Sequence, residues 1–402
     1  MINFKQLEYP VLVYSILFFE VVFTFIFLPI LINSFGEASF GNWIIFLSFL
    51  NLLLFVDGGL SGFYLSTLRN ALAKDRPVIA SQSKKIFLYL LFISPLLCLA
   101  TYLFNYFYFL SPFDYVFLGV VFFSILLQLI NNLNEAILIG CGFEILSKRI
   151  ILISVFIQYL SLYLLIKLGF SLISVPISLL IRFLFIFASQ NISIAIKKLS
   201  ASGLKSISKD IREGYRINIF GKFFSALNAN TFLIILGIAY NSYFVVLISI
   251  ASRFNQLIAT LLDRLNIIIL PRIIERKELL APLRKIKLTQ IFITLILISV
   301  LMASLNTYFI DFWFEGRYSY NLIDLIFLSL YFIVQATSNF FSYQLVSIKK
   351  FQLISKIVAF ENALKLVSLS LIFLNFNFYL IMVVMINLLF IYKYLNVWKE
   401  NI

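Results

Sequence analysis

The sequence predicts an all-α polytopic membrane protein with twelve transmembrane helices in two six-helix bundles and with cytoplasmic N- and C-termini. The composition, the number of long apolar runs and the placement of the basic residues lead to this prediction. Of the 402 residues, 62% are hydrophobic and 12% are charged. A water-soluble globular chain carries about 45–50% apolar and about 25% charged residues. The chain therefore has too few charged side chains to cover a water-soluble surface.

Twelve apolar runs are long enough to cross a bilayer, because a spanning helix needs about 20 mostly apolar residues. In chain order they lie at 10–33, 42–66, 85–104, 114–138, 150–168, 171–195, 216–238, 243–270, 288–310, 321–346, 352–374 and 377–395. No small-residue cleavage site follows the first run, so we expect it to be retained as the first span.

The basic residues between these runs follow the positive-inside rule. Of the 32 Lys and Arg residues, 25 lie in the tails or in connections after even-numbered spans, two lie in other connections and five lie within spans. Both termini are therefore predicted to be cytoplasmic. Because one missed span would scramble this pattern, the charges also support the count of twelve.

The longest Ser-, Gly- and Lys-rich connection lies halfway along the chain. It predicts an N-terminal bundle at 1–196, a cytoplasmic linker at 197–215 and a C-terminal bundle at 216–402. We interpret the linker's basic residues as topology anchors, and contact with anionic membrane lipids is the alternative. A pattern Gln-x-x-Asn-Asn-x-x-Glu at 128–135 recurs as Gln-x-x-Ser-Asn-x-x-Ser at 335–342, which is 207 residues later. This spacing favours two parallel repeats.

Several classes of chemistry are absent from the sequence. The chain has no His and only two cysteines, Cys98 and Cys141, which excludes His-based catalysis, His metal sites and a disulfide framework. There is no Gly-rich loop ending in Lys-Ser/Thr, so no nucleotide-binding domain is expected. We therefore expect a protein that is not an enzyme, with no catalytic residues, metal or cofactor. The net charge of +14 is explained by topology, so no nucleic acid is expected as a partner.

Polar residues within the apolar runs are the candidate functional groups. In the eighth span, nearly all polar residues of 249–264 fall on one helix face, with Arg253 near mid-depth. A charged side chain there costs about 2.5–3.5 kcal/mol, and arginine stays charged, so it needs an anion, a carbonyl or water. The candidate substrate-binding residues are Arg253, Gln256, Thr260, Lys222, Arg182, Asn131, Asn132, Gln335 and Asn339.

These residues also fit structural roles. The amide and hydroxyl stripes suit interhelical hydrogen bonds, worth about 0.6 kcal/mol each. Glu361 and Lys365 stand at i and i+4, which predicts an ion pair that holds helix packing. Glu20 and Asp57 are candidates for ion coupling. For Asp57 the alternative is a buried carboxylate that has a partner or is kept neutral by desolvation. Cations slightly outnumber acids at mid-depth, which favours an anionic substrate.

Short motifs then connect the chain to a family. They are Phe-Gly-Glu-Ala-Ser-Phe-Gly-Asn-Trp at 35–43, Asp-Gly-Gly-Leu at 57–60, Leu-Ile-Gly-Cys-Gly at 138–142, Asn-Thr-Phe-Leu-Ile at 230–234 and Ile-Leu-Pro at 269–271. With the topology, they make the chain resemble Wzx-type polysaccharide repeat-unit flippases, the O-antigen and capsule translocases of the MATE-like MOP exporter superfamily.

The resemblance implies a V-shaped pair of bundles around a cavity in the bacterial inner membrane. It implies translocation of undecaprenyl-pyrophosphate-linked oligosaccharide units by alternating access, for O-antigen, lipopolysaccharide or capsule synthesis. Polysaccharide polymerase and chain-length machinery are the implied protein partners. The family's cavity cations match Arg253, Lys222 and Arg182. Glu20 departs from the likeness, so the coupling ion stays open.

Two other functions are weighed against this one. A MATE-type exporter of cationic drugs predicts a net acidic cavity, whereas cations are in slight excess here. An integral-membrane glycan polymerase or ligase predicts a large extracytoplasmic loop, whereas the longest external connections are about 105–113 and 311–320.

Overall fold

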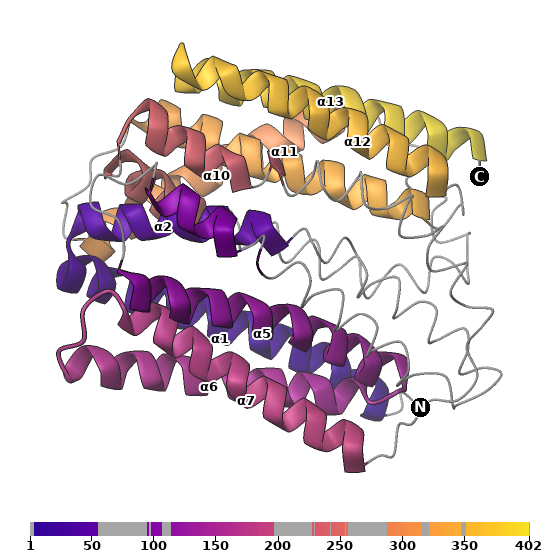
Figure 1. Cartoon of the computed structure of the whole chain (residues 1–402). Coiled ribbons are helices and arrows are strands. Elements are labelled where there is room, and N and C mark those ends of the chain that lie inside the picture. The colour runs from indigo at the N-terminus through magenta and orange to yellow at the C-terminus, as the bar shows by residue number, and fades with distance from the viewer. Residues whose placement is uncertain are drawn as a thin grey trace. The chain divides into compact units, whose positions relative to one another are not determined.

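A computed structural model covers the 402 residues. It describes residues 4–54, 95, 98–106, 114–196, 227–228, 230–241, 243–253, 255, 288–314, 321–346 and 351–401. Within these residues the chain forms helices and turns and contains no strand (Figure 1). The all-α prediction therefore holds for this part of the chain.

The helices run in chain order as follows. They are α1 (Phe4–Phe35), α2 (Glu37–Leu53), α5 (Tyr115–Gly140), α6 (Glu144–Lys167), α7 (Ser174–Ile196), α10 (Leu288–Phe314), α11 (Leu322–Val346), α12 (Phe351–Ser368), the 3-10 helix η3 (Leu369–Phe373) and α13 (Phe376–Asn401). Asn230–Ala239 and Tyr243–Arg253 are two shorter apolar helices.

Seven of the described helices are long and apolar enough to cross a membrane. They lie in α1, α5, α6, α7, α10, α11 and α13, and each coincides with one of the predicted spans. The chain is therefore a multi-pass membrane protein. The total of twelve spans and the cytoplasmic location of both termini stay predictions.

Helices extend beyond the apolar runs that predicted them. The start of α6 is Glu144, ahead of the run that begins at 150, and α13 continues to Asn401. Glu, Lys and other straight-chain polar residues favour helix, so a helix can continue past the hydrocarbon. The eleventh predicted span, 352–374, is not one α-helix, because it changes from α12 to η3 at Leu369.

The turn between α5 and α6 depends on Gly142. This glycine has a φ of +80°, a left-handed conformation in which a side chain is strained. The backbone N–H of Phe143 donates to the carbonyl of Leu138 at 2.8 Å, and the N–H of Gly142 donates to that of Ile139 at 3.1 Å. This pattern closes the end of a helix with a Schellman motif. The sequence Leu-Ile-Gly-Cys-Gly therefore ends one helix and begins the next.

The chain divides into two compact units. Unit 1 comprises Met1–Asn42 and Phe49–Lys222, and unit 2 comprises Trp43–Ser48 and Phe223–Ile402. The predicted linker at 197–215 lies outside the described residues, so the bundle boundaries 1–196 and 216–402 stay a prediction.

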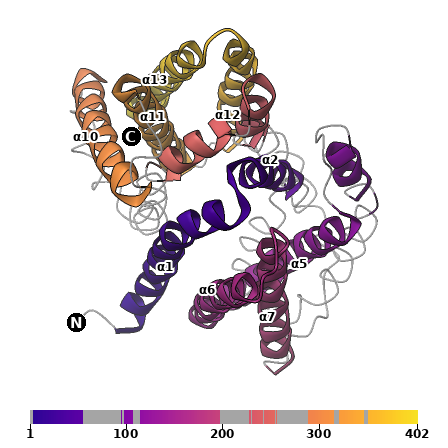
Figure 2. The same ribbon diagram turned by 90° about the vertical axis from the view of Figure 1, so that its left-hand side faces the viewer.

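Each unit is a set of packed helices. In unit 1, α7 packs against α5 and α6, and α1 packs against α6. In unit 2, α11 packs against α10 and α13, and α12 packs against α13. The helices α5, α6 and α7 lie side by side in both views (Figures 1 and 2). Because α7 touches two neighbours, its polar residues have partners on more than one helix.

Helix boundaries recur between the units. Tyr115 begins α5 and Leu322 begins α11, and the same offset of 207 residues separates the start of α6 at Glu144 from that of α12 at Phe351. The packing of α5 on α7 recurs as that of α11 on α13. The recurrence agrees with the two parallel repeats expected from the polar pattern.

Candidate functional site

An ion pair between Glu20 and Arg182 joins α1 to α7 in unit 1. Arg182 Nη2 lies 2.8 Å from Glu20 Oε1, and Nη1 donates to Gln158 Oε1 of α6 at 2.7 Å. The side chain of Arg182 is 17% exposed and that of Glu20 is 36% exposed. Three helices thus bring one cation, one anion and one amide together. Both charged side chains of the pair are partly exposed.

A further polar contact, between Thr24 of α1 and Tyr159 of α6, lies one turn of α1 beyond Glu20. The Thr24 hydroxyl donates to the backbone carbonyl of Glu20 at 2.6 Å and lies 3.1 Å from the Tyr159 hydroxyl. Around them α1 meets α6 through aromatic rings, with Phe23 and Tyr159 centroids 4.8 Å apart and Phe19 and Phe156 centroids 4.7 Å apart. This packing fixes the position of α1 against α6 and therefore the position of Glu20.

The Arg182 guanidinium retains an unused donor. Its Nε is buried and has no hydrogen-bond partner among the residues that the structure describes. The other two nitrogens bind one carboxylate oxygen and one amide oxygen. Guanidinium binds phosphate oxygens in a bidentate manner, and such charge-assisted bonds are about twice as strong as neutral ones. An anionic ligand can therefore compete with Glu20 for the guanidinium of Arg182.

A second polar cluster lies in unit 2, and we call it sealed because its two charged side chains are buried. Lys365 Nζ lies 2.6 Å from Glu361 Oε1 and 3.3 Å from Gln335 Oε1 of α11. Ser338 donates to the same Glu361 oxygen at 2.9 Å, and Tyr394 of α13 donates to Oε2 at 2.5 Å. The side chains of Lys365 and Glu361 are only 1% and 5% exposed.

The predicted pairing of Glu361 with Lys365 is confirmed. Both carboxylate oxygens are hydrogen-bonded, and the ammonium has two acceptors. A buried pair is stable only when such additional bonds satisfy both charges. The cluster therefore cross-links α11, α12 and α13.

The amide stripe of α5 takes part in helix packing. Asn131 is buried and donates from its side-chain nitrogen to the backbone carbonyl of Phe183 on α7 at 2.9 Å. Further along α5, Glu135 pairs with Lys148 of α6 at 2.6 Å. Asn132, the neighbouring candidate, is half-buried. The described contact of Asn131 is interhelical, which is the alternative that the sequence left open.

In α11 the two amide candidates are also half-buried. Gln335 accepts from Lys365, so its described hydrogen bond belongs to the sealed cluster. Asn339 lies one turn further along α11. Substrate binding by either residue stays a prediction.

The first part of the eighth predicted span contains both buried and exposed polar groups. Ser249 and Ser252 are 5% exposed, whereas Arg253 is exposed. Asn255, which falls off the polar stripe, is buried and accepts from Asn306 of α10 at 3.3 Å. The polar face is therefore not uniformly exposed, because Ser249 and Ser252 are buried inside unit 2. Arg253 is the exposed cation within the described helix Tyr243–Arg253.

Four other candidates lie outside the described residues. They are Lys222, Gln256, Thr260 and Asp57. Their roles as cavity or coupling residues stay predictions. Among the residues that the structure does describe, no three Cys, Asp or Glu side chains are grouped in a way that could hold a metal ion.

Sequence reasoning missed Gln158 and Tyr394. Gln158 is the amide in the apolar run of α6, so its polarity was a usable signal. Tyr394 gives no such signal, because a chain with 21 Tyr and 47 Phe offers many similar aromatic positions. Only its contact with Glu361 identifies it.

Comparisons with known proteins reveal the fold. No protein-family model matches the chain, and no curated protein matches it. Solved structures of MOP superfamily transporters do match over nearly the whole chain.

Three of these structures illustrate the likeness. A MOP superfamily transporter from Pyrococcus furiosus has a TM-score of 0.65 at 13% identity, over 98% of this chain and 94% of its own. An outward-facing multidrug resistance MATE transporter has a TM-score of 0.65 at 14% identity over the same shares. The lipid II flippase MurJ, in an inward closed conformation, has a TM-score of 0.73 at 15% identity, over 98% of this chain and 87% of its own. At such identities the likeness shows the fold: the chain folds as the transporters of the MOP superfamily do.

Proposed function

We propose that the protein is a flippase that moves undecaprenyl-pyrophosphate-linked oligosaccharide repeat units across the bacterial inner membrane by alternating access. The observation that carries the proposal is that Arg182, in the apolar helix α7, is partly exposed where α7 meets α1 and α6. Its guanidinium has one unused donor, and Glu20 and Gln158 supply its acceptors. In this proposal the pyrophosphate takes the place of Glu20 at Arg182.

The contrast between the two clusters supports this choice of residue. Lys365 has its acceptors inside unit 2 and is 1% exposed, so it is closed to a ligand. Arg182 is 17% exposed, and its partner is 36% exposed. Arginine keeps its charge in an apolar site and matches phosphate geometry, so it suits a diphosphate head better than a lysine would. A structure with the same fold is a lipid II flippase, and moving a lipid-linked glycan is therefore compatible with this fold.

A reconstitution experiment tests the proposal. The purified protein is placed in liposomes with undecaprenyl-pyrophosphate-linked oligosaccharide, and lectin access measures the glycan that reaches the other leaflet. We expect Arg182→Gln to slow flipping at least about tenfold, since a charge-assisted bond to phosphate contributes about 1.5–3 kcal/mol. Arg182→Lys should restore part of the rate, because it returns the charge without the bidentate geometry.

Arg149→Gln is the matched control. Arg149 also pairs with a glutamate of α1, Glu8, but Arg149 is 60% exposed at the predicted cytoplasmic end. Breaking that pair should leave flipping unchanged. Equal rates for wild type and Arg182→Gln would refute the assignment of Arg182, and absence of flipping by the wild type would refute the function.

Export of cationic small molecules is the second candidate function, because Glu20 is more exposed than Arg182. The Glu20→Gln variant separates the two. In a flippase it frees Arg182 from its competitor, so the affinity for inorganic pyrophosphate rises. In a cation exporter it removes the binding charge, so binding of ethidium is lost.

A further inference from the structure

A pocket lies at one end of unit 1, between two helix turns. Its volume is about 580 Å³, which is within the usual range of about 300–1,000 Å³ for small-molecule sites. The lining residues are Ser34, Phe35, Ser39, Ile166, Gly169, Phe170, Ser171 and Leu172. They come from the α1–α2 turn and the α6–α7 turn. The charge distribution predicts that both turns are extracytoplasmic.

Three hydroxyl groups in this lining are available to a ligand. Elsewhere in the described helices, serine hydroxyls commonly donate to a carbonyl one turn back, as Ser161 and Ser193 do at 2.8 and 2.7 Å. Within the described part of the chain, no hydrogen bond is found for the hydroxyls of Ser34, Ser39 and Ser171. These three side chains can each donate to and accept from a bound molecule.

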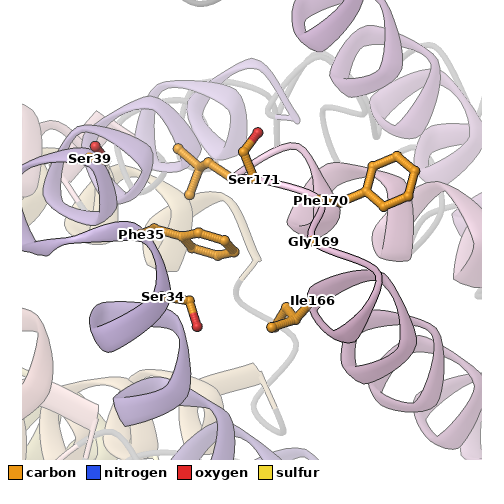
Figure 3. A pocket seen from close by; sticks show the side chains of 8 residues that line it. Ser34, Phe35, Ser39, Ile166, Gly169, Phe170 and Ser171 are labelled. Atoms are coloured by element: carbon orange, nitrogen blue, oxygen red, sulfur yellow. The ribbon is translucent and has the colours of Figure 1, made fainter.

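The α6–α7 turn holds its part of the lining in place. Gly169 has a φ of +80°, and the N–H of Phe170 donates to the carbonyl of Leu165 at 3.1 Å. The N–H of Gly169 donates to the carbonyl of Ile166 at 3.0 Å. This Schellman closure ends α6 and directs the chain into Ser171. Figure 3 shows the Phe35 ring projecting from the end of α1 toward this turn.

None of the described lining residues is charged. The described lining therefore differs from the Arg182 site, where a guanidinium can pair with an anion. An aromatic ring and alkyl groups offer apolar contact, and the hydroxyls offer hydrogen bonds. Such a combination fits a ligand with many hydroxyl groups and apolar C–H faces, which is the chemistry of a neutral sugar.

We propose that this pocket binds a neutral sugar residue of the glycan at the predicted extracytoplasmic end of unit 1. The proposal rests on the proposed flippase function. Ser34 follows Glu20 by 14 residues along α1, which corresponds to about 21 Å. The pocket is therefore separate from the Arg182 site. In this proposal the pocket binds a sugar residue and Arg182 binds the charged pyrophosphate.

Direct binding tests this assignment. The probe is the free neutral oligosaccharide released by mild acid from the lipid-linked precursor, titrated calorimetrically into the detergent-solubilised protein. A triple variant with Ser34→Ala, Ser39→Ala and Ser171→Ala removes three hydroxyls without adding bulk. We expect it to bind the oligosaccharide about tenfold or more weakly. Its affinity for inorganic pyrophosphate should be unchanged.

Two further variants sharpen the result. Ser161→Ala with Ser193→Ala removes two hydroxyls that bond their own helices, and it should leave oligosaccharide binding unchanged. Ser39→Phe places a ring in the pocket and should abolish oligosaccharide binding while pyrophosphate still binds.

Each alternative result overturns the pocket assignment. Equal oligosaccharide affinity in wild type and the triple variant would refute it, and so would wild type that fails to bind the oligosaccharide. If phosphatidylglycerol binds in the pocket and the oligosaccharide does not compete with it, the pocket is a lipid site. In all these cases, Arg182-dependent flipping of the lipid-linked precursor would leave the proposed function standing. Loss of that flipping in wild type would refute the function itself.

Discussion

Replacing Lys365 by methionine should destabilise unit 2 strongly. The ammonium lies 2.6 Å from Glu361 Oε1 and 3.3 Å from Gln335 Oε1, and the two charged side chains are 1% and 5% exposed. Methionine has a similar length but no charge. The substitution therefore leaves the Glu361 carboxylate buried without its counter-ion.

The expected loss is about 3 kcal/mol of unfolding free energy. Removing one member of a buried pair typically costs about 3–5 kcal/mol. The lower end applies here because Ser338 and Tyr394 still donate to the carboxylate. In the double variant Glu361→Gln, Lys365→Met no charge is left unpaired, so stability should return to within about 1 kcal/mol of wild type.

Equilibrium denaturant unfolding of the purified protein in micelles measures these differences. The matched control is Lys148→Met, which breaks a Lys–Glu pair of the same 2.6 Å length whose members are 14% and 25% exposed. Water can solvate the remaining Glu135 there, so the control should lose only about 1 kcal/mol or less. If Lys365→Met is no less stable than Lys148→Met, then burial does not govern the cost and the reasoning fails.

Three further predictions concern other residues. Under the proposed function, Arg253→Ala should abolish surface polysaccharide in the source organism at normal protein levels, and Arg253→Lys should partly restore it; normal polysaccharide in the alanine variant would exclude a cavity role. Gln158→Leu removes the acceptor of Arg182 Nη1, and it should lower pyrophosphate affinity about fivefold by calorimetry, since one hydrogen bond that orients a charged group is lost. Burial raises the pKa of the Cys141 thiol to about 11. In a Cys98→Ser variant, maleimide labelling should therefore be slow at pH 8 and rise about tenfold per pH unit toward pH 10; full labelling at pH 8 would contradict this.

Local spacing in the sequence predicts some of these contacts well. Glu361 and Lys365 are four residues apart, and any helix brings such residues to one face. The structure adds that Gln335, Ser338 and Tyr394 complete the cluster. Long apolar runs likewise predict the helices that span the membrane, because a spanning helix must bond its backbone internally.

The partner of Arg182 could not be predicted from spacing. Glu20 is 162 residues away in the sequence, and it meets Arg182 only because α1 packs on α6 while α7 packs on α6 as well. Side-chain packing over whole helix faces determines which helices become neighbours. A single sequence does not reveal this packing. For the same reason, the polar stripe of α5 did not show whether Asn131 faces a cavity or, as described, the backbone of α7.

The repeat offset of 207 residues relates the two polar clusters. Gln158 of α6 corresponds to Lys365 of α12, and Ser154 corresponds to Glu361. In unit 2 this corresponding helix segment supplies both charges, so the cluster is satisfied internally and sealed. In unit 1 the same position supplies only a neutral amide, and the charges arrive from α1 and α7. Charges on neighbouring helices can separate when those helices shift, whereas an i,i+4 pair stays together on its own helix. We therefore propose that the Arg182–Glu20 pair of unit 1, which can be opened, binds a ligand, and that the Glu361–Lys365 cluster of unit 2 has a fixed structural role.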